Sequence, residues 1–196
     1  MLRIFFCIVF VLSLLNRVEA KINISLGPYY SSYLLYMDDE DSKGEWSLGG
    51  EVGITGFLPH IGLKLRGSKI RYDAPVESVS YDFEYIPITL CTSFDLLPFM
   101  DIHWFTLSME TGFGLYLWKG FSDGEVVVIS DGGKMNEKDI GFVGGVTVRL
   151  KVNRFIGLEF VTRYNYIASS NIYKYGYFDK DEKIWENGIG VNFKIR

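Results

Sequence analysis

Histidine and cysteine are scarce in this chain. Its 196 residues include two of each: His60 and His103 lie far apart, and Cys7 lies in an apolar N-terminal segment. If that segment is removed, Cys91 is the one remaining thiol, so no internal disulfide can form. Two isolated histidines match no zinc-ligand spacing. We therefore expect no metal site and no cofactor, and stability must come from packing and backbone pairing.

Long apolar runs are also missing. The longest, residues 4–15, spans about twelve residues, whereas a transmembrane helix needs ~20. Arg3 before this run and Val18-Glu19-Ala20 after it are typical of a cleaved signal peptide. We predict that residues 1–20 are an export signal and that residues 21–196 form one domain.

Positive charge is not in excess. The formal net charge is −4. The predicted signal contains Arg3, Arg17 and Glu19, a net charge of +1, so residues 21–196 carry a net charge near −5. Such a balance argues against nucleic acid as a partner. Aromatic residues and glycine are instead plentiful, with 13 Tyr, 15 Phe and 21 Gly.

The clearest pattern is a hairpin formed by residues 139–168. In both arms apolar and polar residues alternate, which places them on opposite faces of a strand. Only residues 152–155 separate the arms. Each arm has roughly ten or more residues, against ~5–6 for strands of soluble sheets. Length, alternation and the terminal tyrosines Tyr164 and Tyr166 indicate a membrane-spanning hairpin with its apolar face outward.

Six further segments have strand character. The predicted strands are residues 22–36, 46–57, 61–72, 80–91, 103–118 and 185–195. Pro87 lies inside the fourth of these, where it cannot donate to a ladder, so we expect a bulge or phase slip there. The pattern also predicts that Tyr81, Phe83 and Tyr85 face outward.

The connections alternate between long and short. Long polar loops are predicted at residues 37–44, 73–78, 119–138 and 169–183, and short turns at 58–60, 94–101 and 152–155. In outer-membrane barrels short turns face the periplasm and long loops face outside, and the strand number is even. The sequence therefore predicts an all-β fold, an eight-stranded antiparallel up-and-down transmembrane β-barrel in the outer membrane.

The signal, the strands and the C-terminal segment Gly188-Ile-Gly-Val-Asn-Phe-Lys-Ile195 resemble the small outer-membrane barrels of the OmpA-barrel, OmpX and OmpW-like group. The resemblance covers residues 21–196. It implies that the C-terminal strand is read by the barrel-assembly machinery, although this chain ends on Ile195-Arg196 where the family commonly ends on an aromatic residue. Segment Glu84–Leu90 also resembles a strand of this group. The group includes adhesins, pores and lipid enzymes, so resemblance alone names no ligand.

Charged residues at inward positions form the candidate site. A narrow eight-stranded barrel is filled by its own side chains, and unpaired charges inside it would be costly. Six acidic and six basic residues occupy predicted inward positions. Because their charges nearly cancel, we predict a network of ion pairs that plugs the lumen. The predicted members are Glu51, Lys64, Arg66, Asp82, Glu84, Glu110, Arg149, Lys151, Glu159, Arg163, Glu186 and Lys194.

Other candidate motifs have simpler interpretations. Both histidines fall at predicted periplasmic turns, on the wrong rim for lipid chemistry. The acidic residues 38–41 lack the spacing and turn glycine of a calcium loop. Asp131-Gly132-Gly133 predicts a turn, and residues 125–129 a strand extension that could offer an edge to partners.

Three functions stay open at this point. The first is a non-enzymatic barrel with a structural or surface-interaction role, with lipid around it and an extracellular partner at its long loops. The second is a narrow, OmpW-like channel for small or apolar solutes. The third is a lipid-modifying enzyme, which the histidine positions disfavour. A soluble lipocalin-like barrel is the alternative fold, and it would bury Trp46, Tyr166 and Trp185 in its core.

Overall fold

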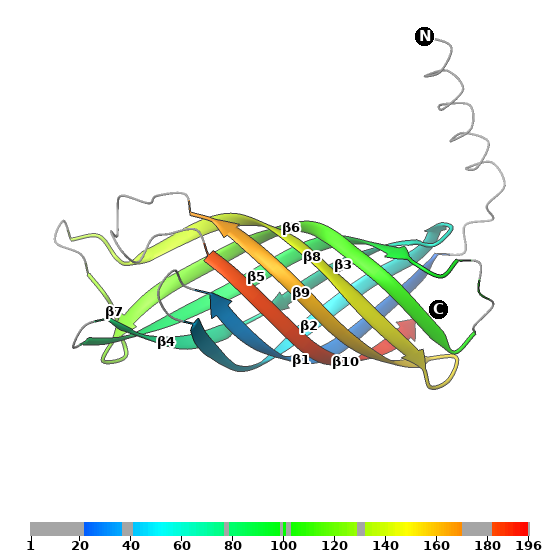
Figure 1. Ribbon diagram of the computed structural model, residues 1–196, viewed down its shortest axis with the longest axis horizontal. Coiled ribbons are helices and arrows are strands. Elements are labelled where there is room, and N and C mark those ends of the chain that lie inside the picture. Colours follow the sequence, from blue (N-terminus) through cyan, green and yellow to red (C-terminus); the bar gives the residue numbers. More distant parts are fainter. Residues whose placement is uncertain are drawn as a thin grey trace, which may run out of the picture.

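The computed structural model describes residues 22–36, 41–76, 79–98, 100, 103–128, 132–169 and 182–195. Ten strand segments lie along the chain (Figure 1). They are β1 (Asn23–Tyr36), β2 (Asp41–Leu58), β3 (Ile61–Ser68), β4 (Ile70–Val76), β5 (Val79–Asp95), β6 (Phe105–Ser122), β7 (Glu125–Val126), β8 (Asn136–Lys151), β9 (Ile156–Ala168) and β10 (Glu182–Ile195). Among the described residues no helix is long and apolar enough to cross a membrane.

The strands close into one barrel. Each wall strand pairs antiparallel with its neighbours in the chain, β1 pairs with β10, and the β5–β6 pairing closes the ring. Because β3 and β4 are two parts of one wall strand and β7 is a short extension, the wall has eight strands. The predicted up-and-down eight-stranded barrel is confirmed.

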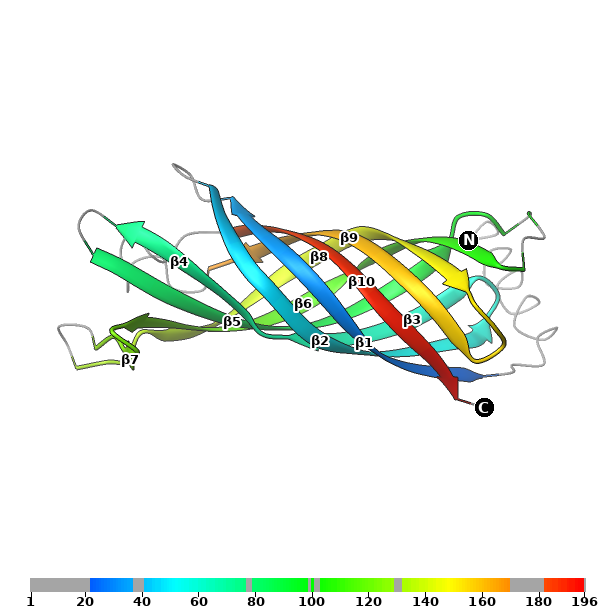
Figure 2. The same ribbon diagram turned by 90° about the horizontal axis from the view of Figure 1, so that it is seen from below.

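The two ends of the barrel differ. The turn at residues 59–60, residues 96–98 after β5 and the turn at residues 152–155 lie at the same end as the start of β1 and the end of β10; we call this the terminal end (Figures 1 and 2). At the opposite end, the hairpin end, the β4–β5 pair and the β6–β8 pair with β7 project beyond the other strands (Figure 2). His60 lies in the β2–β3 turn and His103 in the turn before β6, as the sequence predicts.

The outer wall carries the apolar half of the alternation. Large exposed side chains include Leu48 at 70%, Phe113 at 61% and Phe142 at 62% of full exposure. Trp46 and Trp185 also face outward, where they stack or pack edge-on against Tyr30 and Tyr164. A wall that is apolar outside and charged inside is the reverse of a lipocalin-like barrel, so that alternative is wrong.

Four predicted boundaries need correction. Strand β2 already begins at Asp41, inside the predicted first loop. The predicted loop 73–78 is largely a tight hairpin, because Asp73 pairs with Asp82 and Val76 with Val79. In the predicted loop 119–138, β6 continues to Ser122 and β8 starts at Asn136. Backbone pairing tolerates these polar residues where a strand rises beyond the apolar belt. Strand β10 begins at Glu182 rather than residue 185, and most of the predicted loop 169–183 lies outside the described residues.

Pro87 causes no phase slip. The register is the same on both sides of it, since Gly67 pairs with Ile88 and Ile70 with Tyr85. Pro87 has no backbone N–H to donate, and it lies opposite the end of β3, next to the break between β3 and β4 at Lys69. The facing of β5 above Pro87 is nevertheless the opposite of the prediction: Phe83 and Tyr85 are buried, with 3% and 1% exposure, while Asp82 is exposed.

Candidate functional site

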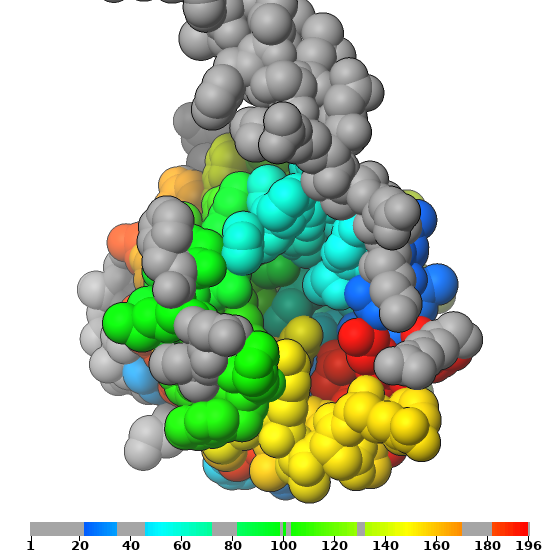
Figure 3. All heavy atoms as spheres, turned by 90° about the vertical axis from the view of Figure 1, so that its right-hand side faces the viewer, coloured from blue at the N-terminus to red at the C-terminus, as the bar shows by residue number. Residues whose placement is uncertain are grey.

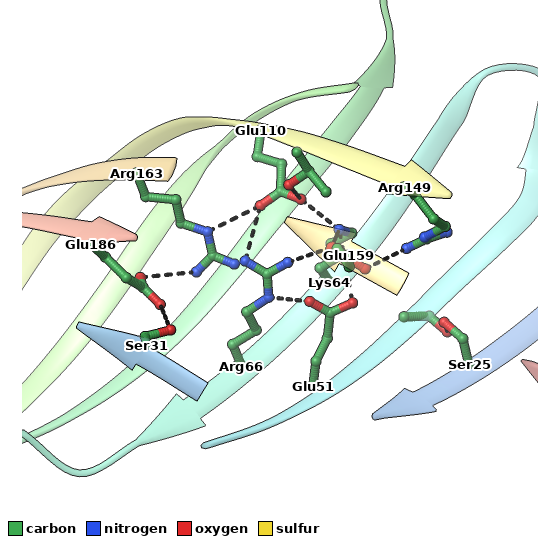
Figure 4. A network of polar contacts seen from close by, with 12 residues as sticks. Ser25, Ser31, Glu51, Lys64, Arg66, Glu110, Arg149, Glu159, Arg163 and Glu186 are labelled. Carbon is green, nitrogen blue, oxygen red and sulfur yellow. Dashed lines mark hydrogen bonds and ion pairs between the residues drawn. The ribbon is translucent and has the colours of Figure 1, made fainter. Parts of the chain in front are cut away.

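The middle of the lumen holds a network of ion pairs (Figure 4). Its members are inward residues of six wall strands, and we call them the charge network. They are Glu51, Lys64, Arg66, Glu110, Arg149, Glu159, Arg163 and Glu186. Four carboxylates meet four cations, so the network is neutral in sum.

Arg66 is the hub of the charge network. Its Nε donates to Glu51, its Nη1 lies 3.3 Å from Glu110 Oε2, and its Nη2 lies 2.7 Å from Glu159 Oε1. The guanidinium carbon also lies 5.7 Å from the ring centre of Tyr29. A guanidinium presents five N–H donors in a planar fork, which explains how one side chain can bind three carboxylates.

Lys64 and Arg163 extend the charge network from this hub. Lys64 Nζ lies 2.6 Å from Glu110 Oε1 and also pairs with Glu159. Arg163 Nε lies 3.2 Å from Glu110 Oε2, and its Nη1 lies 3.5 Å from Glu186 Oε2. Glu110 therefore accepts from three cations, and Thr147 donates to it at 2.5 Å. Removing any one cation leaves a buried carboxylate short of a partner.

The two ends of the charge network carry opposite charge. Arg149, nearest the terminal end, donates from Nη2 to Glu159 Oε2 at 3.0 Å, and that carboxylate is shared with Lys64 and Arg66. Glu186, at the other end, has Arg163 as its cation and accepts hydrogen bonds from Ser31 at 3.2 Å and Tyr33 at 3.4 Å. The cationic end thus faces the terminal end of the barrel.

Four predicted members lie elsewhere. Asp82 is exposed, and Glu84 lies on the outer face of β5, where Lys69 Nζ at 2.7 Å and Arg71 Nη2 at 3.2 Å pair with it. The inverted facing of β5 above Pro87 accounts for both corrections. Lys151 and Lys194 occupy inward positions in the alternation of β8 and β10, but they lie at the terminal end of the barrel, where both are exposed to solvent.

An apolar layer, which the sequence pattern did not predict, fills the lumen toward the hairpin end. Tyr85 and Trp118 stack with ring centres 6.3 Å apart. The polar atoms of the layer are bonded: Tyr116 donates to Asn165 at 2.8 Å and Trp118 to Asp139 at 2.7 Å. Together with the charge network it makes a plug of two layers. The apolar layer comprises Tyr33, Ile70, Phe83, Tyr85, Tyr116, Trp118, Met135, Ile167 and Ile184.

The two cavities that the described residues enclose within the plug are small. One cavity beside Tyr29 and Arg66 and another between Tyr116 and Glu186 have volumes of about 10 Å³ each. A single water needs roughly 10–15 Å³ by the same kind of measure, so neither cavity forms a continuous path. Toward the terminal end the lumen widens into a cavity of about 540 Å³.

No group of three or more His, Cys, Asp or Glu residues could hold a metal among the residues described.

Residues 38–40 of the acidic segment, and Asp131 of the predicted turn, lie outside the described residues. Gly132 has a positive φ of 84°, and β7 covers Glu125–Val126 of the predicted strand extension. Cys91 is buried and faces the lumen as a free thiol.

Neither a protein-family model nor a curated protein sequence matches this chain. Among solved structures, Neisserial surface protein A is 17% identical, with a TM-score of 0.59, covering 88% of this chain and 97% of its own. Ail, the attachment invasion locus protein of Yersinia pestis, solved with the heparin analogue sucrose octasulfate, is 14% identical, with a TM-score of 0.53 over 89% and 99%. The outer-membrane protein OprG of Pseudomonas aeruginosa is 13% identical, with a TM-score of 0.53 over 91% and 98%. The resemblance predicted from the sequence is confirmed at the level of the fold: this chain has the fold of the small outer-membrane β-barrel proteins.

Proposed function

We propose that this chain is a non-enzymatic outer-membrane barrel with a structural or surface-interaction role, and that its lumen is closed to solutes. The observation that carries the proposal is the two-layer plug. Seven buried charges and the half-buried Arg149 pair across the lumen, and nine buried residues of the apolar layer lie above them. Separating such pairs would leave uncompensated charges in a narrow space, which costs several kcal/mol per ion.

The outer wall supports placement in the outer membrane. Its apolar belt is bordered by aromatic side chains at both ends: Tyr30 stacks on Trp46 toward the hairpin end, and Trp104 packs on Phe105 at the terminal end. Amphipathic aromatic rings are enriched where lipid tails meet headgroups. Strand β10, which contains Gly188–Ile195, is then the segment that the barrel-assembly machinery would read. Lipid is the partner of the whole wall.

The hairpin end is the surface for an extracellular partner. There the β4–β5 and β6–β8 hairpins rise above the remaining wall, and residues of β7 pair with β6 (Figure 2). Paired backbone offers a better-defined binding surface than an unpaired loop. The similar barrel Ail is named for attachment and invasion, and this role at the cell surface is the one we extend to the present chain.

A channel for small or apolar solutes is the second candidate function. The observation in its favour is the aromatic lining of the lumen at the hairpin end, where Phe83, Tyr85 and Trp118 would suit an apolar guest. The charge network beneath them opposes passage along the axis. An enzyme acting on lipid has less support, because His60 and His103 both lie at the terminal end.

Solute uptake into proteoliposomes tests the proposal. Vesicles holding the folded protein should swell in arabinose or glycine no faster than empty vesicles, whereas an open porin serves as the positive control. The variant Trp118→Ala shortens the apolar layer and leaves the charge network in place, so it should also stay closed. Rapid swelling with the unmodified protein would instead favour the channel.

A further inference from the structure

The terminal end of the barrel opens into a cavity that the plug does not use. Figure 3 looks onto this end, where a hollow lies between β2, the turn before β6 and the β8–β9 turn. The cavity has a volume of about 540 Å³, which is within the ~300–1,000 Å³ range typical of small-molecule sites. We call it the vestibule. Its floor is the cationic end of the charge network, formed by Lys64 and Arg149.

Arg149 is the part of the charge network that reaches into the vestibule. Its side chain is 23% exposed, whereas the other side chains of the network are at most 6% exposed. Nη2 donates to Glu159, and Nε is itself buried but has no hydrogen-bond partner among the described residues, so one donor of this half-buried guanidinium is left unsatisfied. An Nε–H and an Nη–H on one side of a guanidinium form the fork that binds carboxylate or phosphate oxygens.

Hydroxyl side chains line the vestibule together with Arg149. Thr106 of β6 lies directly opposite Arg149 of β8, and Ser108 lies opposite Thr147 on the same pair of strands. All four residues line the vestibule, as does Ser93 from β5. Hydroxyls that rotate to donate can complete the coordination of an oxyanion around a cation.

Negative charge on the vestibule wall is limited. Of the described residues that line it, Asp95 is the one carboxylate, and it is already engaged. Its Oδ1 accepts from the backbone N–H of Leu97 at 3.0 Å, and its Oδ2 lies 3.7 Å from His60 Nδ1. An anion entering the vestibule therefore meets the partly exposed guanidinium of Arg149 and hydroxyl groups, with little opposing charge.

We propose that the vestibule is a binding site for a small oxyanion that bears a carboxylate or phosphate group. Arg149 holds the oxygens through the part of its guanidinium that faces the vestibule, and Thr106, Ser108 and Ser93 donate from the wall. The anion enters from the terminal end and stops at the charge network, so it is bound and does not pass through. Both a free phosphorylated solute and the headgroup of an anionic phospholipid carry this chemistry.

Side-chain NMR of the folded barrel in detergent micelles tests the site. The Nε–H resonance of Arg149 is assigned by its loss in Arg149→Lys, and inorganic phosphate is then added at constant ionic strength. We expect a saturable shift of this resonance with phosphate and with acetate, and none with tetramethylammonium chloride. An unmoved resonance, or an equal shift with chloride alone, overturns the proposal.

Wall variants keep the test independent of Arg149. Thr106→Val and Ser108→Ala should each weaken phosphate binding about threefold or more, because each removes one neutral donor. Arg149→Gln should weaken it about tenfold or more, because it removes a charge-assisted contact. Lys151→Gln is the matched control: it removes a rim charge beyond the vestibule lining and should leave the binding constant unchanged. Equal weakening by Lys151→Gln and Ser108→Ala would mean that the anion binds to the rim and not in the vestibule.

Lipid nanodiscs separate the two sources of the oxyanion. If the shift appears when phosphatidylglycerol replaces phosphatidylcholine, with no phosphate added, the occupant is a lipid headgroup. If it appears after phosphate addition in both lipids alike, the occupant is a soluble solute. A resonance that moves under neither condition contradicts the site.

Discussion

Arg66 and Glu159 meet across the full width of the barrel. Arg66 lies on β3 and Glu159 on β9, and three wall strands separate them in either direction around the ring. Their side chains nevertheless approach to 2.7 Å between Nη2 and Oε1. Opposite walls are therefore joined directly, and the lumen is closed by contact rather than merely narrowed.

Removing Arg66 should destabilise the barrel far more than removing a surface arginine. Arg66→Met leaves Glu51, Glu110 and Glu159 with Lys64 as their nearest shared cation, and breaking a buried pair costs about 3–5 kcal/mol. Arg71→Met is the matched control: Arg71 is 64% exposed, and its partner Glu84 keeps Lys69 Nζ at 2.7 Å, so the loss should be about 0–1 kcal/mol. Urea unfolding of the barrel in lipid measures both. Equal losses for the two variants would show that Arg66 is not the hub.

Arg163 and Glu186 should be coupled in a double-mutant cycle. Arg163→Ala leaves Glu186 without its cation, and Glu110 keeps Lys64 and Arg66. We expect a large loss of unfolding free energy, about 3–5 kcal/mol, and partial recovery when Glu186→Gln removes the orphaned charge. Thr162→Ala, on the lipid-facing side of the same strand, is the control. Strictly additive losses would contradict a direct pairing of these residues.

Inward and outward positions of β9 should respond differently to substitution. Phe160→Arg places a charge toward lipid, which costs about 2–4 kcal/mol near the midplane. Gly157→Ser faces the lumen, where the nearest atom to an added Cβ is Leu150 O at 3.4 Å, so it should be mild. On the neighbouring strand β8, Gly145→Ser should be severe, because its Cβ would lie 2.4 Å from Thr162 O. The order of the folding yields checks which face of β9 points to lipid. A lower yield for Gly157→Ser than for Phe160→Arg would mean that the assigned inner and outer faces of β9 are the wrong way round.

The closed ladder predicts heat-modifiable migration. A ring of paired strands leaves no free edge for detergent to open, so unboiled protein in SDS should stay folded. Unboiled and boiled samples should therefore run as bands of different mobility. Extraction of the protein by salt washes without detergent would contradict the membrane-spanning barrel.

The sequence predicted the wall better than it predicted the contents of the lumen. Period-two alternation specifies which residues face lipid, and this is why Leu65, Phe113 and Phe160 all lie outward as expected. It also brings Arg149 and Glu159 together, because residues at inward positions of neighbouring strands meet by register. These inferences depend on local pattern and strand pairing alone.

The apolar layer and the facing of β5 could not be derived in the same way. Alternation labels two faces, but it does not say which one is the lumen when aromatic residues occupy the inner face. Phe83 and Tyr85 were expected to face lipid, yet they pack on Trp118 inside. Trp118 was a sequence signal for an inward aromatic residue, because it lies an even number of residues from the inward Glu110 on the same strand. In the pairing of β5 with β6, the partner of Trp118 is Tyr85. Strands β1, β4, β5, β6, β9 and β10 all contribute residues to this layer, and one sequence does not reveal which of their side chains meet.

Ionic conductance across a planar lipid bilayer tests the closed lumen most directly. The two-layer plug predicts little or no steady current through the wild-type barrel at any moderate voltage. Trp118→Ala, which thins the apolar layer, should remain silent because Arg66 still binds Glu159 across the lumen. Stable, well-resolved conductance steps from the wild-type protein would contradict the plug and make the channel the better interpretation.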